Sequence, residues 1–318
     1  MSILNRIFYK IRKSINDSFL PKINLNKNVE DTLIISGDPR GGTTWLSEII
    51  MEIPNTALVW EPLSIPLIDK LNKHNFSHRQ FIAESDNWYE VKNYFCDIFK
   101  GNIYNHHLFQ NQSYFNLINV KRTHVKFCRA NQLLPWLTNQ FQFRYAPIYI
   151  IRHPCAVIAS QLKQGGWNGV KSSFHIPEDK PYPEFYTKHE DFLKGLNSKA
   201  QVLAATWCLC NQIPLSHPDN NKRWITVTYE SLVTDGIYQL KRIEDRWGIT
   251  LPDSAYDKLN KASATTIKGS PIMDGKGSQL SHWKYNLSDR DIEEIMMVLD
   301  YFGIELYNQS PLPTIVFT

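Results

Sequence analysis

Residues 32–51 read TLIISGDPRGGTTWLSEIIM. The apolar, β-branched run 33–35 predicts a strand, the glycine- and proline-bearing turn 37–42 predicts a loop, and the pattern from Thr43 onward predicts a helix. Glycines let backbone N–H groups close round an anion, and the start of a helix adds unpaired N–H groups and a positive dipole end. The stretch therefore predicts a phosphate-binding loop.

The spacing of this loop can be compared with the nucleotide-binding pattern G-x-x-x-x-G-K-[ST]. Gly37, Gly42 and Thr44 fit the pattern, but Thr43 stands where the lysine that reaches the β- and γ-phosphates is expected. Arg40 still supplies a cation inside the loop. We therefore expect a ligand with a 5′-phosphate and no γ-phosphate. A P-loop kinase or NTPase, and a nucleotide-binding module without catalysis, remain alternatives.

The segment PRGGTTWL, residues 39–46, resembles the PRSGTTxL loop of sulfotransferases, which grips the 5′-phosphosulfate end of 3′-phosphoadenosine-5′-phosphosulfate (PAPS). Gly41 replaces the usual serine. The resemblance implies that Arg40 stabilises charge during transfer, and that the donor is held by loop residues Arg40, Gly41, Gly42, Thr43, Thr44 and Trp45.

Composition limits the remaining classes of function. The chain has 318 residues, 42% of them hydrophobic, enough for one large α/β domain or two small ones. The net charge of +4 is too weak to indicate nucleic-acid binding.

The five cysteines are odd in number and lack zinc-like spacing, so we expect reduced thiols in the cytoplasm and no metal. No apolar run is long enough to span a membrane.

Residues 1–28 are set apart by their pattern. Apolar residues recur at helical spacing, and Arg6, Lys10, Arg12 and Lys13 fall mostly on the opposite side. This pattern predicts a basic amphipathic helix followed by a polar linker. Packing of the helix on the protein body and docking on an anionic membrane surface, at the inner membrane face, are the two interpretations. The main domain is expected from residue 29 to residue 318.

A carboxylate follows the next predicted strand, 57–60. Because Pro62 disfavours helical backbone at Glu61, we expect Glu61 to be extended at the carboxyl end of the strand, which faces the ligand crevice in open α/β sheets. The segment VWEPLS is similar to the FEPL segment of carbohydrate sulfotransferases, and this implies that Glu61 is the base for the acceptor hydroxyl. A surface carboxylate is the alternative.

A second candidate base lies in the strand-like segment INVKRTHVKF, where His124 and Lys126 share one face. A histidine in a broadly similar K-x-H segment is the base in aryl sulfotransferases, although KRTH has one residue more. Lys126 matches the lysine of VK segments in bacterial relatives, or is a solvated strand lysine.

The second anchor is PIYIIRHPCAVIASQLKQGGW, residues 147–167. A buried strand delivers Arg152 to its carboxyl end, and the following helix carries Ser160 on its second turn. Arginine can bind a phosphate with two hydrogen bonds, and serine adds one. The pair resembles the R-x-P-x-x-x-x-x-S element for the 3′-phosphate of PAPS. Lys276, in the glycine-rich segment 268–285, is a further candidate donor contact, with a solvated loop as the alternative.

The order of these elements predicts one α/β domain of P-loop type, with a mainly parallel central sheet flanked by helices on both faces. The resemblance implies an enzyme that transfers a sulfuryl group from PAPS to an acceptor hydroxyl on a carbohydrate or glycolipid and releases 3′-phosphoadenosine-5′-phosphate (PAP). We assign the aromatic interval 63–118 to acceptor specificity; core packing of its aromatic residues is the alternative.

Overall fold

The computed structural model describes residues 14, 25–64, 71, 73–103, 106–109, 111–112, 117, 119–176, 181–263 and 278–318. Apart from Ser14, residues 1–24, which include the basic residues of the predicted amphipathic helix, lie outside the described residues, and so does Lys276. Residues of the predicted linker contact the domain. Leu25 is buried, and the Lys27 N–H donates to the Lys100 carbonyl at 3.1 Å.

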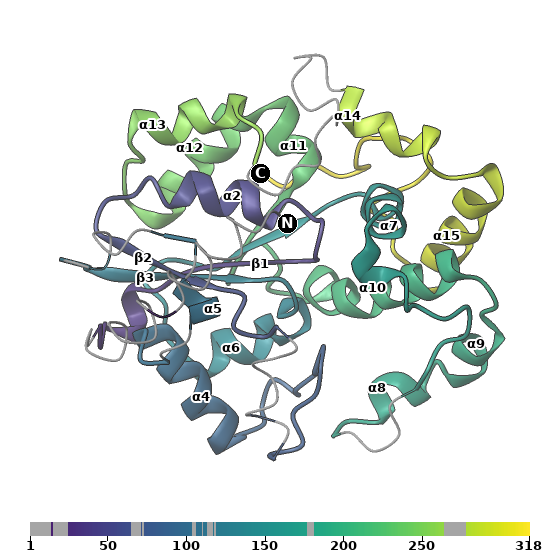
Figure 1. The fold of residues 1–318 in the computed structure, drawn as a ribbon, viewed down its shortest axis with the longest axis horizontal. Helices are drawn as coiled ribbons and strands as arrows, with labels where there is room; N and C mark the ends of the chain where they lie inside the picture. The colour runs from purple at the N-terminus through teal and green to yellow at the C-terminus, as the bar shows by residue number, and fades with distance from the viewer. Residues whose placement is uncertain are drawn as a thin grey trace.

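Five parallel strands form the sheet in the order β2-β3-β1-β4-β5 (Figure 1). Their ranges are β1 Leu33–Gly37, β2 Thr56–Trp60, β3 Arg122–Phe127, β4 Ile148–Ile151 and β5 Ile225–Thr228. All of β1, β4 and β5 is buried, as expected for strands covered on both faces. The predicted fold class is confirmed.

Helices cover both faces of the sheet (Figure 1). Alternate residues of β1 face opposite layers of these helices. Leu33 and Ile35 pack with α2 (Thr43–Ile50) and α12 (Gly236–Trp247), whereas Ile34 belongs to the core formed with α4 (Tyr89–Lys100) and α6 (Leu134–Gln140). A third core joins β4 to α7 (Pro154–Lys163), α10 (Lys199–Ser216) and α15 (Asp289–Tyr301).

The shorter helical segments are α5 His106–Phe109, α8 Glu184–Thr187, α9 Glu190–Gly195, α11 Tyr229–Thr234, α13 Asp253–Asp257 and α14 Ser278–Ser281, with 3-10 turns η2 Val29–Asp31, η4 Asn131–Leu133, η5 Gly165–Trp167, η6 Lys258–Asn260 and η7 His282–Tyr285. Of these segments, α11 starts directly after β5. Because all five strands are parallel, their carboxyl ends meet at one edge of the sheet. That edge brings together the phosphate loop after β1, Glu61 after β2 and Arg152 after β4.

Candidate active site

The phosphate loop connects β1 to α2, as predicted. Gly42 is the N-cap of α2 and has φ 96°, a left-handed conformation that glycine adopts without strain. A Cβ at Gly42 would lie 2.5 Å from Cδ2 of Tyr229. At Gly37, a Cβ would lie 2.6 Å from the Ile150 carbonyl oxygen. Both glycines are therefore required by the close approach of β4 and α11.

Gly41 has a different constraint. Its N–H donates to the Asp38 carbonyl at 2.9 Å, and a Cβ at Gly41 would lie 2.8 Å from that same oxygen. Real Cβ atoms are not found so close to backbone oxygen, so a serine here would require the loop to shift. The tight turn at Asp38 explains why this loop accommodates glycine where the related loops have serine.

The structure brings Arg40, Arg152 and Ser160 together, although they come from three separate elements. Arg40 Nε donates to Ser160 Oγ at 2.9 Å, and Arg152 Nη1 donates to the Arg40 carbonyl at 3.2 Å. The Arg152 guanidinium lies 4.3 Å from the centroid of the Tyr229 ring, which holds it by a cation–π contact. We call Arg40, Arg152 and Ser160 the arginine cluster.

The arginine cluster has the properties of an anion site. Burial and the neighbouring Arg152 charge lower the pKa of Arg40, because two cations lie side by side. Arg152 Nε is buried and has no hydrogen-bond partner among the described residues. A buried donor without a partner is costly, and a phosphate oxygen would satisfy it. The cluster therefore fits a phosphate group.

The other predicted loop contacts are arranged around α2. Thr43 is buried, and its Oγ1 lies 3.4 Å from Cys128 Sγ. Thr44 is half-buried in the first turn. The Trp45 ring packs edge-on against Tyr229 and its Nε1 donates to the Lys258 carbonyl at 3.1 Å, so Trp45 fastens η6 to the loop.

A second group of polar residues surrounds Glu61, which follows β2 directly. Lys126 Nζ lies 2.5 Å from Glu61 Oε1, and Cys128 Sγ lies 3.2 Å from the same oxygen. Arg129 Nη1 is 3.7 Å from Glu61 Oε2. The Lys126 ammonium also lies 3.8 Å from the Trp60 ring centroid. We call Glu61, Lys126, Cys128 and Arg129 the carboxylate cluster.

The backbone of Glu61 differs from the expectation. Its φ is 44°, in the left-handed region, so the predicted extended backbone before Pro62 is wrong. The Glu61 N–H donates to the Lys126 carbonyl at 2.9 Å, and the side chain returns to Lys126 Nζ. These two bonds hold Glu61 in a conformation that a residue in this position seldom adopts, and such strain is concentrated at functional sites.

The carboxylate cluster keeps Glu61 ionised. Burial raises the pKa of Glu61, but the Lys126 charge and hydrogen bond, with smaller contributions from Cys128 and Arg129, outweigh burial and bring the pKa below its ordinary value. Burial raises the pKa of the Cys128 thiol, although Lys126 opposes this shift. At neutral pH the cluster therefore contains a carboxylate next to a protonated thiol.

His124 lies apart from both clusters. It is fully buried in the middle of β3, with Nε2 2.8 Å from Ser47 Oγ and Nδ1 3.3 Å from the Leu33 carbonyl. Because a carbonyl can only accept, Nδ1 carries the proton and Nε2 accepts from Ser47. Burial lowers the pKa of His124 to about 4, so the ring is neutral at pH 7. The structure does not bring His124 to the edge where Glu61 and the loop meet.

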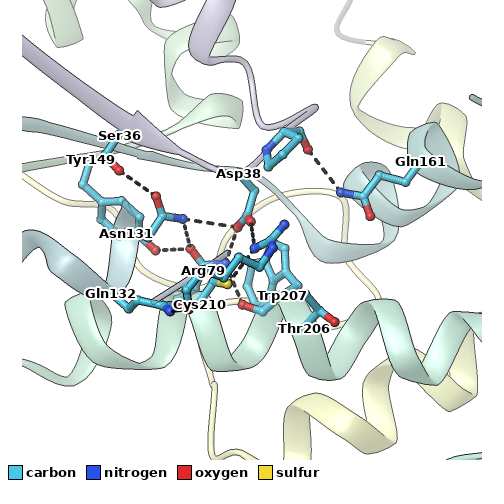
Figure 2. A network of polar contacts seen from close by, with 12 residues as sticks. Ser36, Asp38, Arg79, Asn131, Gln132, Tyr149, Gln161, Thr206, Trp207 and Cys210 are labelled. Atoms are coloured by element: carbon cyan, nitrogen blue, oxygen red, sulfur yellow. Dashed lines mark hydrogen bonds and ion pairs between the residues drawn. The ribbon is translucent and has the colours of Figure 1, made fainter. Parts of the chain in front are cut away.

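Asp38, within the phosphate loop, is the centre of a buried polar network (Figure 2). Its Oδ1 accepts from Arg79 Nη1 at 3.1 Å, and its Oδ2 accepts from Asn211 Nδ2 at 2.5 Å and Asn131 Nδ2 at 3.4 Å. Tyr149 Oη donates to Asn211 Oδ1 at 2.7 Å. The network fixes the loop to β4, η4, α10 and the segment around residue 79.

Reasoning from the sequence missed several residues of this edge: Asp38, Arg79, Cys128, Arg129 and Tyr229. A usable signal existed for Cys128 and Arg129, since both follow a predicted strand directly, at its carboxyl end. None existed for Arg79, because its partner lies 41 positions away in the sequence.

Among the described residues, no group of histidine, cysteine and acidic side chains could hold a metal ion. No helix in that part of the chain has the length and apolar character needed to cross a membrane.

Three solved structures resemble the chain, each at 16% sequence identity. Mouse sulfotransferase SULT7A1 complexed with PAP has a TM-score of 0.46, and the match covers 89% of this chain and 87% of that protein. The sulfotransferase domain from the curacin biosynthetic pathway has a TM-score of 0.44 with 87% and 99% covered, and the sulfotransferase domain from the Synechococcus PCC 7002 olefin synthase has a TM-score of 0.47 with 89% and 97% covered. At these values they do not bear on the function of this chain.

No curated protein matches the chain. The family model of the sulfotransferase domain, however, matches residues 30–286, which is most of the chain and includes both the arginine cluster and the carboxylate cluster. This match confirms the resemblance to PAPS-dependent sulfotransferases and the prediction of an enzyme. The chain belongs to the sulfotransferase domain family.

Proposed function

We propose that the protein transfers the sulfuryl group of PAPS to a hydroxyl on a carbohydrate or glycolipid acceptor, with Glu61 as the general base. The observation that carries this proposal is the position of Glu61 at the same sheet edge as the phosphate loop and the arginine cluster. A donor bound in the loop and an acceptor bound at Glu61 would meet at that edge.

The donor side of the proposal is supported by charge. The loop N–H groups and the start of α2 suit the 5′-phosphosulfate, while Arg152 and Ser160 suit the 3′-phosphate. Arg40 lies between these two positions, because its side chain contacts Ser160 while its backbone belongs to the loop. We assign Arg40 to the stabilisation of charge on the leaving phosphate.

The acceptor side is supported by the geometry at Glu61. Oε1 is occupied by Lys126, so Oε2 is the oxygen we assign to the acceptor hydroxyl. As the hydroxyl oxygen attacks sulfur, a new S–O bond forms, the bond between sulfur and the bridging oxygen breaks, and the hydroxyl proton passes to Glu61. PAP leaves with the electron pair of the broken bond. Catalysis then depends mainly on positioning and electrostatics.

A hollow of about 340 Å³ at the start of α4 supports the choice of a carbohydrate. Its lining residues Asp86–Glu90 belong to the interval that we assign to acceptor specificity, and Pro181 and Tyr182 complete the lining from another part of the chain. Trp88, Tyr89 and Tyr182 provide broad amphipathic rings, and Asp86 and Glu90 provide hydrogen-bond acceptors for hydroxyl groups. Rings and carboxylates of this kind suit a polyhydroxylated acceptor.

Two measurements test the proposed function. Calorimetric titration should show binding of PAP and much weaker binding of ATP with magnesium; the reverse order would support a kinase or NTPase. Incubation with PAPS labelled in the sulfuryl group and extracted glycans or glycolipids should give a labelled product. Binding of PAP without any labelled product from these acceptors would contradict the proposed transfer.

A further inference from the structure

Arg129 is the least satisfied cation at the sheet edge. It follows β3 by two residues, and its side chain is 18% exposed. Among the described residues its one ion-pair partner is Glu61, at 3.7 Å, which is too long for a hydrogen bond. Its Nε is buried and has no hydrogen-bond partner within the described part of the chain. Nitrogen–hydrogen groups in this situation favour an acceptor from outside the protein.

The other cations at this edge either pair with a carboxylate or face the proposed donor. Lys126 neutralises Glu61 at 2.5 Å, and Arg79 neutralises Asp38 at 3.1 Å. Arg40 and Arg152 face the donor in the proposed function. Once these pairs are made, the positive charge of Arg129 remains in excess beside the carboxylate that we assign as the base.

Among the described residues, the histidines near this edge do not change this balance. Burial, with Arg79 and Arg129 acting in the same direction, lowers the pKa of His78 to about 3, so its ring is neutral at pH 7. His107 lies close to Glu61, but burial, with Lys126 and Arg129 acting in the same direction, keeps the pKa of His107 below its ordinary value despite Glu61. The ring is therefore neutral at pH 7 and adds no charge that would compete with Arg129.

We propose that the acceptor carries a negatively charged group, a carboxylate, sulfate ester or phosphate ester, that pairs with Arg129 close to the hydroxyl that is sulfated. A guanidinium binds such groups with two parallel hydrogen bonds. With hydrogen bonds of about 2.8 Å at each end and 3.7 Å between Arg129 Nη1 and Glu61 Oε2, an anion bonded to Nη1 and the hydroxyl lie at most about 9 Å apart. This distance fits groups on one sugar ring or on adjacent rings.

The inference rests on the proposed function, and its test separates the two. The protein is first saturated with PAP, which occupies the donor site, and inorganic sulfate is then titrated by calorimetry as a probe of the acceptor anion site. The Arg129→Gln variant should bind sulfate at least tenfold more weakly than the wild type. The matched control is Arg290→Gln, which removes the same charge from a side chain that is 79% exposed and paired with Glu294; it should bind sulfate as the wild type does.

Each outcome has a distinct meaning. Failure of PAP to bind contradicts the proposed function. Binding of PAP with equal sulfate affinity in the wild type and Arg129→Gln contradicts only the anion site. A loss of PAPS affinity in Arg129→Gln as large as the loss of sulfate affinity would assign Arg129 to the donor and overturn the inference.

Matched acceptors identify the kind of anion. In the labelled-transfer assay, methyl glucuronide and glucose 6-phosphate are each compared with methyl glucoside, and the wild type should prefer the charged members by at least tenfold in kcat/KM. The member with the larger preference distinguishes a carboxylate from a phosphate. Arg129→Gln should reduce this ratio towards one; an unchanged ratio would contradict the role of Arg129.

Discussion

Lys126 Nζ lies 2.5 Å from Glu61 Oε1, and this ion pair determines the charge of the proposed base. Burial alone would favour a protonated Glu61, whereas the ammonium group favours the ionised form and brings the pKa below its ordinary value. A general base must be deprotonated to accept a proton, so Lys126 keeps Glu61 ready for catalysis across the neutral range.

The first prediction concerns this pair. Lys126→Met removes the cation that lowers the pKa of Glu61 and leaves burial to raise it, so the acidic limb of the pH profile of kcat should move to higher pH. The measurement is kcat between about pH 4 and pH 8, because this range includes the ordinary pKa values of carboxylates and histidine. Lys194→Met, which breaks an exposed pair with Glu190, is the control and should leave the limb in place. An acidic limb that stays fixed or moves to lower pH in Lys126→Met would contradict the role of the pair.

The second prediction concerns the Asp38–Arg79 pair. Asp38→Asn leaves the Arg79 guanidinium without its carboxylate in a buried position, and the free energy of unfolding should fall by about 3 kcal/mol. The double variant Asp38→Asn/Arg79→Met removes both charges and should recover part of this loss. Urea unfolding of the wild type, Asp38→Asn, Arg79→Met and the double variant gives the coupling energy directly. Additive effects of the two substitutions would show that the pair does not stabilise the loop.

The third prediction concerns the 3′-phosphate of the donor. Arg152→Ala removes charge-assisted hydrogen bonds worth about 1.5–3 kcal/mol each, so binding of PAP should weaken at least tenfold. Adenosine-5′-phosphosulfate lacks the 3′-phosphate and should bind almost as it does to the wild type. Calorimetric titration of both nucleotides checks the difference. Equal weakening of the two would mean that Arg152 supports the loop and does not recognise the 3′-phosphate.

Much of the fold could be predicted because its signals are local. The apolar run of β1, the glycines of the loop and the strand before Arg152 each identify their element within a few residues. The convergence of Arg40, Arg152 and Ser160 could be inferred because parallel strands place their carboxyl ends at one edge.

The remaining features depend on tertiary contacts that no local pattern records. The left-handed backbone of Glu61 is stabilised by two bonds to Lys126, 65 positions away, and these override the preference that Pro62 imposes. His124 matched a catalytic segment only approximately, and its register on β3 directs it towards Ser47 on α2. The Asp38 network joins five separate segments, so its members could be recognised only after folding.

The most direct test of the account compares Glu61→Gln with His124→Gln in labelled sulfuryl transfer from PAPS, with PAP affinity and thermal unfolding measured on the same samples. Glu61→Gln preserves the shape and removes the base, so kcat should fall by about 10²–10⁴ while PAP affinity is unchanged. His124→Gln disturbs a buried hydrogen-bonded residue and should lower the unfolding temperature, with turnover retained per folded molecule. Near-normal turnover in Glu61→Gln, together with abolished turnover and intact PAP binding in His124→Gln, would contradict the account and assign the base to His124.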